Sequence, residues 1–305
     1  SVILEPFRTH LKITIRATCF LRGFPQLLKE ITYRKGGFAV KIKSLFIYPI
    51  KSCGATEVDA LHFEPWGPRH DREYMIVDRD GNSLTQRDFP RLALIRAYLA
   101  TNDLLIRFSE KITLALPLEN PRAQLRRVTV WGDTVLAFDQ GDIAARVFHE
   151  FLEAPCRLVQ YQPQKYQRIR FSDTLGEKIF VSFADGYHLL VTTEESLADL
   201  NFRLKNPIPM DRFRPNVVLD GAGLPYEEDD WSVLRTPAGI LRGGARCVRC
   251  ATTTVDQITG QKDRNNELLR ALAKYRRTPK GLVFGRNFLH PPEGILRKGD
   301  VVTAA

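Results

Sequence analysis

The chain has 305 residues, 44% hydrophobic and 26% charged, and no apolar run near the roughly 20 residues of a membrane-spanning helix, so we expect a soluble globular protein without a transmembrane segment. Its five scattered cysteines exclude a disulfide-rich secreted scaffold and favour a reducing compartment, which we expect to be the cytoplasm. The net charge of +10 comes without a basic stripe or a nucleic-acid-binding motif, so we expect no nucleic-acid partner, and an anionic small ligand better explains the scattered arginines.

Residues 1–40 form a basic segment that carries seven Lys or Arg and two Glu, a net charge of +5. The segment has no clean helical stripe and no cleavage site of small residues, and we expect it to be an extension outside the fold. Organelle targeting is an alternative use of such a basic N-terminus. Because Val40 precedes the first expected strand and a valine codon can start translation, another alternative is that residues 1–39 come from a misassigned start.

Residues 41–161 predict a first β-rich module, in which short strand-like runs recur at a spacing of about ten residues. These runs cover 44–50, 73–77, 92–99, 103–108, 112–116, 127–132 and 134–138. A helix is predicted over 141–154, with Asp142 as its N-cap, because Ile143, Val147 and Phe151 recur every four residues. Ala144, Phe148 and Leu152 stand beside them, and 156–161 returns to strand.

Residues 162–178 are polar and lack periodicity, so they are predicted to be a linker or a mobile loop. Residues 179–305 then form a second β-rich module. Its helices are expected over 192–205, starting with a capping box of Thr192 and Glu195 and burying Leu197, Leu200 and Leu204, and over 266–277. Its strands are expected at 216–220, around 239–243, at 281–290 and at 299–304. The predicted fold class is mainly β with a few helices (α+β), in two β-rich modules.

The pair Cys247 and Cys250 lies in "RCVRCATTTVD", between Arg246 and Arg249 and a threonine run. A structural zinc site would need four ligands, and a redox pair should open a helix, for which "ATTTVD" is poor material. The pair is therefore a single-thiolate metal ligand, a lone nucleophile or two inert thiols. A soft thiolate beside two arginines suits a metal that also carries an anionic organic ligand.

Six segments occur in one order along the chain: "YPIKS" (48–52), "DRDGNSLTQRDFPRLALI" (78–95), "SFADGYHLLVTTEESLADLN" (182–201), "RFRPNVVLDG" (212–221), "RCVRCATTTVD" (246–256) and "FGRNFL" (284–289). In this order and spacing the chain resembles the MOSC family, in the branch that has an N-terminal β-barrel module and includes the mitochondrial amidoxime reducing component and its bacterial relatives. The resemblance covers about residues 42–303.

The resemblance implies that the C-terminal module is a MOSC-type β-barrel and that the protein binds a molybdenum cofactor of the molybdopterin type. It implies reduction of small N-hydroxylated substrates, such as amidoximes, hydroxylamines and N-hydroxylated bases. The chain has no iron–sulfur motif, so electrons would come from a separate ferredoxin, flavodoxin-like protein or cytochrome/flavin reductase. We expect a monomer. The alternative is a non-redox carrier of the cofactor or of sulfur on Cys250.

Residue roles implied by the resemblance follow the matching motifs. Cys250, and not Cys247, would ligate the metal, and Asp185 would lie near the metal as a second catalytic residue. The implied cofactor-binding residues are Lys51, Ser52, Arg72, Arg214, Asn216, Arg249 and Asn287. The chemistry is suitable, because Lys and Arg bind phosphate and a carboxylate can relay a proton.

Bland roles remain open for several of these side chains. Lys51 is also suited to a solvated strand end, Arg214 to a surface ion pair, and Asp185 to a turn with Gly186. The three tryptophans, Trp66, Trp131 and Trp231, are expected to serve packing.

Overall fold

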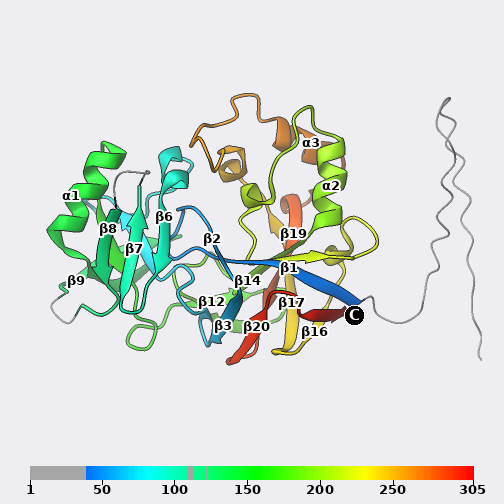
Figure 1. Cartoon of the computed structure of the whole chain (residues 1–305), viewed down its shortest axis with the longest axis horizontal. Coiled ribbons are helices and arrows are strands. Elements are labelled where there is room, and N and C mark those ends of the chain that lie inside the picture. The colour runs from blue at the N-terminus through cyan, green and yellow to red at the C-terminus, as the bar shows by residue number, and fades with distance from the viewer. Residues whose placement is uncertain (1–38, 109–112, 121–122) are drawn as a thin grey trace, which may run out of the picture. The chain divides into compact units, whose positions relative to one another are not determined.

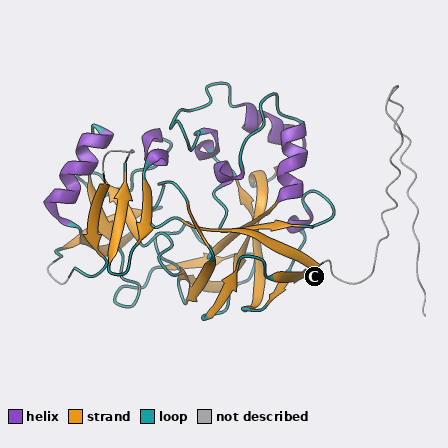
Figure 2. Cartoon of the chain, in the orientation of Figure 1, coloured by secondary structure: helices purple, strands orange, loops and turns teal. Residues whose placement is uncertain are grey.

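Strands dominate the computed structural model, which describes residues 39–108, 113–120 and 123–305 (Figure 1, Figure 2). The described residues hold three α-helices, α1 (Gly141–Leu152), α2 (Glu194–Phe202) and α3 (Glu267–Tyr275). The predicted mainly β fold with a few helices is therefore confirmed. The predicted basic extension lies, up to residue 38, outside the described residues.

Seven strands of the largest sheet close into a barrel, because the last of them pairs back with the first. In order around the barrel they are β14 (Leu189–Thr193), β15 (Val217–Asp220), β1 (Ala39–Ile47), β21 (Val301–Ala304), β16 (Val233–Thr236), β17 (Gly239–Val248) and β19 (Gly281–Leu289). The predicted C-terminal barrel is present. Its strand β1, however, comes mostly from the segment predicted to belong to the first module, since local patterns do not reveal which distant strand is the partner.

The burial pattern of β1 changes phase along the strand. Val40 and Ile42 are buried, and after them Leu45 and Ile47 are buried, so one residue is skipped in the alternation. The register with β15 shifts between Ile42 and Ser44, which marks a β-bulge. A bulge adds one residue to one strand and so restores the inward direction of the apolar side chains. The end of β1 therefore delivers the 48–52 segment to the site described below.

Two smaller sheets form the first module. One has the order β5 (Tyr74–Val77), β11 (Arg157–Gln160), β10 (Asp133–Asp139), β9 (Leu125–Val130), and the other has the order β6 (Arg96–Leu99), β7 (Asp103–Arg107), β8 (Thr113–Pro117). Helix α1 packs on this module, with the rings of Phe108 and Phe148 edge to face at 4.8 Å between centroids. Val77, Val128 and Val159 from the first sheet share a buried cluster with Phe183, and this cluster ties the 181–185 segment to the first module.

The remaining strands are short: β2 (Thr56–Val58), β3 (Ala60–Glu64), β4 (Gly67–Pro68), β12 (Ile169–Ser172), β13 (Glu177–Phe180), β18 (Arg277–Thr278) and β20 (Gly294–Arg297). Strands β12 and β13 pair as an antiparallel hairpin, so the segment 162–178, which was predicted to be a linker or loop, contains β12 and the start of β13. Its residues include charged and exposed side chains on a two-stranded ribbon, and such a ribbon leaves little apolar periodicity to detect. The predicted strand 92–99 also differs, because a 3-10 turn (Pro90–Leu94) occupies its first part.

Two predicted helix caps are wrong. Helix α1 has Gln140 at its N-cap, and Asp142 lies inside the first turn, where its carboxylate pairs with Arg157. Helix α2 is capped by Thr193, whose hydroxyl accepts the N–H of Ser196. The predicted cap residue Thr192 is instead buried in β14.

The buried helix faces agree better with the predictions. Leu197, Leu200 and Leu204 are buried as expected. In α1 the buried residues are Ala144, Phe148 and Leu152, whereas Ile143 is exposed.

Candidate functional site

Lys51 and Asp185 form an ion pair that joins two predicted site segments. Lys51 follows β1 and is buried, and its Nζ donates to the Phe183 carbonyl oxygen at 2.8 Å and to the Asp185 carboxylate. The Asp185 side chain is 72% exposed, so solvent reaches this carboxylate while its ammonium partner is covered. The pair therefore presents an exposed acceptor held by a buried cation.

Trp131 is the second donor to Asp185, with its Nε1–H 2.7 Å from Oδ1. It occupies the two-residue turn between β9 and β10, where Trp131 (φ 53°) and Gly132 (φ 84°) both adopt positive φ. Trp131, which was expected to serve packing, therefore also holds Asp185. Its ring is half exposed, and the guanidinium carbon of Arg87 lies 4.8 Å from the ring centroid. The sequence signal for this role is a bulky residue in a turn that favours Asn or Gly.

The charges around Asp185 favour its ionised form. Desolvation by the neighbouring protein raises the pKa of this carboxyl, but the charge and hydrogen bond of Lys51 and the hydrogen bond of Trp131 hold the pKa well below its ordinary range. Because the side chain is largely exposed, solvent screens part of this attraction. Desolvation in turn lowers the pKa of Lys51, and the Asp185 charge opposes that effect. Asp185 is therefore a hydrogen-bond acceptor, and the Lys51 ammonium is more acidic than that of an ordinary lysine.

Arg72 and Arg214 share one aromatic ring. Their guanidinium carbons lie 4.5 and 4.3 Å from the ring centroid of Tyr48, and the Tyr48 hydroxyl donates to the Pro215 carbonyl at 2.9 Å. Arg72 also pairs with the buried Asp71 carboxylate. Arg214 donates to the Cys53 carbonyl at 2.5 Å, and within the described residues no carboxylate forms an ion pair with it. One of these two positive charges is thus matched by a carboxylate and the other is not.

Three of the predicted cofactor-binding residues have left-handed backbone conformations: Ser52 (φ 64°), Arg72 (φ 52°) and Arg214 (φ 58°). For residues other than glycine such conformations cost of order 1 kcal/mol or more each. The carbonyl of Ser52 accepts the Nε2–H of Gln86 at 2.8 Å, which helps to hold this turn. The strain is concentrated where these basic residues gather, and backbone strain of this kind is enriched at functional sites.

Asn216 is buried and its side chain bonds within the protein. Its Oδ1 accepts from Arg72 Nη1 at 3.0 Å and from the Leu190 N–H at 3.2 Å, and its Nδ2 donates to the Phe46 carbonyl at 3.1 Å. This arrangement makes Asn216 a residue that positions Arg72. Asn287 likewise donates to the Ala245 carbonyl at 3.0 Å, inside the barrel wall.

The two cysteines of the C-x-x-C segment have different surroundings. Cys250 is exposed, and its Sγ lies 3.3 Å from the Thr252 hydroxyl at the start of a 3-10 turn (Ala251–Thr254). Cys247 is half-buried, and Arg249 Nη1 lies 2.7 Å from its Sγ. The more accessible thiol is therefore that of Cys250.

Arg249 connects the cysteine segment to the arginine pair. Its Nη2 donates to the carbonyl of Phe213 at 2.6 Å, next to Arg214, while its buried Nε has no hydrogen-bond partner among the described residues. Arg72, Arg214 and Asp185 influence one another's charge states, so they lie within electrostatic reach. No contact in the described part of the chain joins the Cys250 thiol directly to Asp185 or Lys51. The structure thus gathers the basic residues into one cluster and links the thiol segment to it through Arg249.

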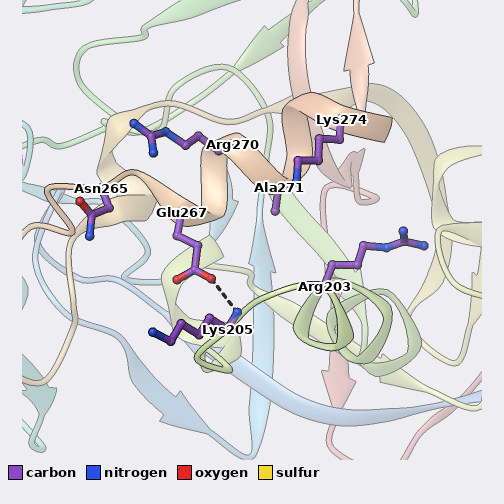
Figure 3. Close-up of a pocket in the computed structure, with 7 residues that line it drawn as sticks. All are labelled: Arg203, Lys205, Asn265, Glu267, Arg270, Ala271 and Lys274. Atoms are coloured by element: carbon purple, nitrogen blue, oxygen red, sulfur yellow. Dashed lines mark hydrogen bonds between the residues drawn. The ribbon is translucent and has the colours of Figure 1, made fainter.

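A cavity of about 380 Å³ lies elsewhere, between the end of α2 and α3 (Figure 3). It is lined by Arg203, Lys205, Asn265, Glu267, Arg270, Ala271 and Lys274, none of which was predicted as a site residue. Figure 3 shows the charged ends of Arg203 and Arg270 pointing in different directions. Arg203 is already bound by the Asp199 carboxylate at 2.8 and 2.9 Å. We therefore place the candidate site at the Lys51, Arg72 and Arg214 cluster.

Comparison with known proteins identifies the family of the chain. Residues 39–155 match the MOSC N-terminal beta barrel domain and residues 179–303 match the MOSC domain. The chain belongs to the MOSC-domain family with an N-terminal MOSC barrel domain, and the resemblance noted in the sequence is confirmed.

Three curated relatives illustrate the range of this family. The human mitochondrial amidoxime-reducing component 1 is 30% identical over 95% of this chain and 89% of its own length. The human mitochondrial amidoxime reducing component 2 is 34% identical over 74% of this chain and 70% of its own length. A molybdenum cofactor sulfurase from Oryza sativa subsp. japonica is 32% identical over 81% of this chain, which spans 32% of that longer protein.

Among the described residues no helix is long and apolar enough to cross a membrane.

Proposed function

We propose that this protein is a molybdenum-cofactor-dependent reductase of small N-hydroxylated compounds such as amidoximes. The observation that carries the proposal is the exposed Cys250 thiol, whose segment Arg249 links to a cluster with more cationic side chains than carboxylates. The names of its relatives support it, since they include amidoxime-reducing components and a molybdenum cofactor sulfurase at 30% to 34% identity.

The side chains of the cluster fit an anionic pterin cofactor. Arg214, with no carboxylate ion pair in the described residues, and Arg249, with an unpartnered buried Nε, are donors that a phosphate or pterin oxygen would satisfy. Lys51, Ser52 and Arg72 would complete this binding surface, Asn216 would hold Arg72, and Cys250 would supply a soft thiolate ligand to the metal. When bound, the molybdenum cofactor supplies the two-electron reduction.

The protein's own contribution to the reaction is proton handling and orientation. Loss of water from an N–OH group requires a proton on the departing oxygen. Because its pKa is low, Asp185 is a carboxylate that accepts a hydrogen bond and orients the N–OH group. Because its pKa is lowered, the Lys51 ammonium is a better proton donor than an ordinary lysine. The Trp131 N–H fixes the carboxylate in place.

Electrons would arrive from a separate protein, in the ferredoxin, flavodoxin-like or cytochrome/flavin class. The cytoplasmic location and the monomeric state stay predictions, and two of the relatives above carry the word mitochondrial in their names.

A second candidate function is a non-redox carrier of the cofactor or of sulfur on Cys250. It is favoured by the relative named molybdenum cofactor sulfurase and by the exposure of the Cys250 thiol. Benzamidoxime reduction by cofactor-loaded protein, with reduced methyl viologen as the electron donor, separates the two. Turnover that depends on molybdenum supports the reductase, whereas a persulfide on Cys250 without turnover supports the carrier.

A further inference from the structure

A cation without a carboxylate partner lies beside Trp131. The guanidinium carbon of Arg87 is 4.8 Å from the centroid of the Trp131 ring, and Arg87 Nε is 3.4 Å from the Thr85 hydroxyl oxygen. Among the described residues, neither Nη atom of Arg87 has a hydrogen-bond partner, and no carboxylate forms an ion pair with this side chain. Because these Nη atoms are also not buried, both are open to a ligand.

The charges around Arg87 favour an anion. The carboxylate of Asp88, the next residue, is bound by the Thr85 hydroxyl at 3.1 Å instead of by Arg87. Lys262 is exposed, and its Nζ donates to the backbone carbonyl of Arg87, so a second cation belongs to the same surface. An anionic group bound here would therefore have two cationic side chains in its neighbourhood.

Trp131 connects this cation to the Asp185 carboxylate. Arg87 lies over the indole ring, and the N–H at the edge of the same ring donates to Asp185 Oδ1 at 2.7 Å. Because both groups contact one indole, the distance between them is comparable to the length of a small substituted aromatic molecule. Trp131 is 49% exposed, so it offers a planar, largely apolar surface between the cation and the carboxylate.

Asp185 keeps one oxygen for a ligand. Its Oδ1 accepts the hydrogen bonds of Lys51 and Trp131, whereas Oδ2 has no partner within the described part of the chain. Because the side chain is 72% exposed, Oδ2 is the oxygen that can accept the hydrogen of an N–OH group. The surface around Trp131 therefore holds a free acceptor on Asp185 and free donors on Arg87.

We propose that Arg87 is a specificity-determining residue that binds a carboxylate of the substrate, an inference that rests on the proposed reductase function. The N–OH group would donate to Asp185 Oδ2, a planar ring would lie along Trp131, and the carboxylate at the other end would accept from both Arg87 Nη atoms. A guanidinium is suited to this role, because its planar fork of N–H donors matches the two oxygens of a carboxylate. The preferred substrates are therefore planar N-hydroxylated compounds with a carboxylate opposite the N–OH group.

The test compares two amidoximes of the same shape, 4-carboxybenzamidoxime and the uncharged 4-carbamoylbenzamidoxime. The full chain, loaded with cofactor, is given each compound with reduced methyl viologen as the electron donor. KM should be about tenfold lower for the carboxylate, because its hydrogen bonds to Arg87 are charge-assisted. Equal KM values, or a lower KM for the carbamoyl compound, would overturn the inference, while the turnover itself would still support the reductase function.

Variants assign the preference to Arg87. The ratio of the two KM values is the readout, because any loosening of Trp131 affects both substrates alike. In Arg87→Gln the two KM values should become nearly equal, and in Arg87→Glu the carboxylate should bind more weakly than the carbamoyl compound, because like charges repel. Arg235→Gln removes an exposed arginine of the barrel strand β16 and is the matched control, which should keep the preference of the unaltered chain. A preference for the carboxylate that survives in Arg87→Glu would contradict the proposal.

Binding without turnover separates this inference from the proposed function. With no electron donor present, 4-carboxybenzamidoxime should shift the indole N–H signal of Trp131 in an NMR spectrum of the cofactor-loaded chain, while the Trp231 signal, from the barrel core, stays in place. The shift should need about tenfold more ligand in Arg87→Gln. A Trp131 shift that depends on Arg87 would support this binding role even if neither amidoxime were reduced, a result that would refute the reductase alone. An unmoved Trp131 signal, or the same affinity in Arg87→Gln, would overturn the role of Arg87.

Discussion

The indole N–H of Trp131 donates a 2.7 Å hydrogen bond to Oδ1 of Asp185, and it does so from the turn between β9 and β10 of the first module. Asp185 itself lies in the 181–185 segment before β14, a strand of the barrel. The carboxylate that the proposed function places beside the reaction is therefore held by two donors, Trp131 from this turn and Lys51 from the segment after β1.

Asp185→Asn should reduce turnover while leaving molybdenum content nearly unchanged. The amide keeps the shape but removes the charge that orients the N–OH group and holds the proton-donating Lys51 ammonium, and proton transfer of this kind typically contributes about 100- to 10,000-fold in rate. Measuring kcat for benzamidoxime alongside metal content checks this. If Asp185 only shapes the turn with Gly186, Asn will serve equally well, and kcat will equal that of the unaltered protein.

Trp131→Phe should lower kcat by about tenfold, because it removes a single hydrogen bond to a charged group. Its effect should act through Asp185, so adding Trp131→Phe to the Asp185→Asn variant should change kcat little further. A merely structural role would instead give the same loss in both backgrounds. Trp231→Phe provides a tryptophan control outside the site.

Arg214→Ala and Arg72→Ala should separate cofactor retention from stability. Arg214 has no carboxylate ion pair in the described residues, so its loss should reduce cofactor content after gel filtration and change the free energy of unfolding by about 1 kcal/mol. Arg72 is paired with the buried Asp71, so its loss leaves a buried carboxylate without its cation and should cost about 3 to 5 kcal/mol. Denaturant unfolding measures the difference. Equal stability losses with full cofactor in both variants would contradict these roles.

Two neighbouring buried histidines predict an acid-sensitive barrel. His188 and His290 are buried with ring centroids 4.3 Å apart, and desolvation lowers their pKa values to about 4 and about 3, from an ordinary value of 6.5. The unfolded chain therefore binds protons first, so this stabilisation is complete above pH 6.5 and is lost as the pH falls from 6.5 towards 4.

The loss should reach roughly 3 kcal/mol for each histidine, since one pH unit corresponds to about 1.4 kcal/mol. His290→Phe keeps an aromatic ring against Phe63, on which His290 stacks at 4.0 Å, and should flatten part of the pH dependence of the unfolding free energy. A variant with the same slope between pH 6.5 and 4 would show that other groups cause the acid sensitivity.

Local sequence patterns predicted the elements better than the contacts between them. The periodicity of Leu197, Leu200 and Leu204 identified the buried face of α2, because helix burial repeats over three and four residues. The closure of the barrel through β1 and the β14–β19 pair joins segments far apart in sequence, and no local pattern records that pairing.

Several residues of the candidate site were predicted from the ordered motifs. The motifs predicted Lys51, Asp185 and the arginines as site residues, and the structure brings Lys51 and Asp185 into contact. Trp131 was missed because its role depends on a hairpin turn of one module reaching a loop of the other. The positioning of Arg72 by Asn216 was not predicted either, since it depends on hydrogen bonds between residues far apart in the sequence.

The most direct test of the central claim is molybdenum per chain in protein expressed with the cofactor available, compared among the unaltered chain, Cys250→Ser and Cys247→Ser. We expect molybdenum in the unaltered chain and little in Cys250→Ser, because a hydroxyl replaces a soft thiolate poorly. Cys247→Ser should keep most of the metal, since the Cys247 thiol bonds to Arg249. Equal molybdenum in the two cysteine variants, or none in the unaltered chain, would contradict it.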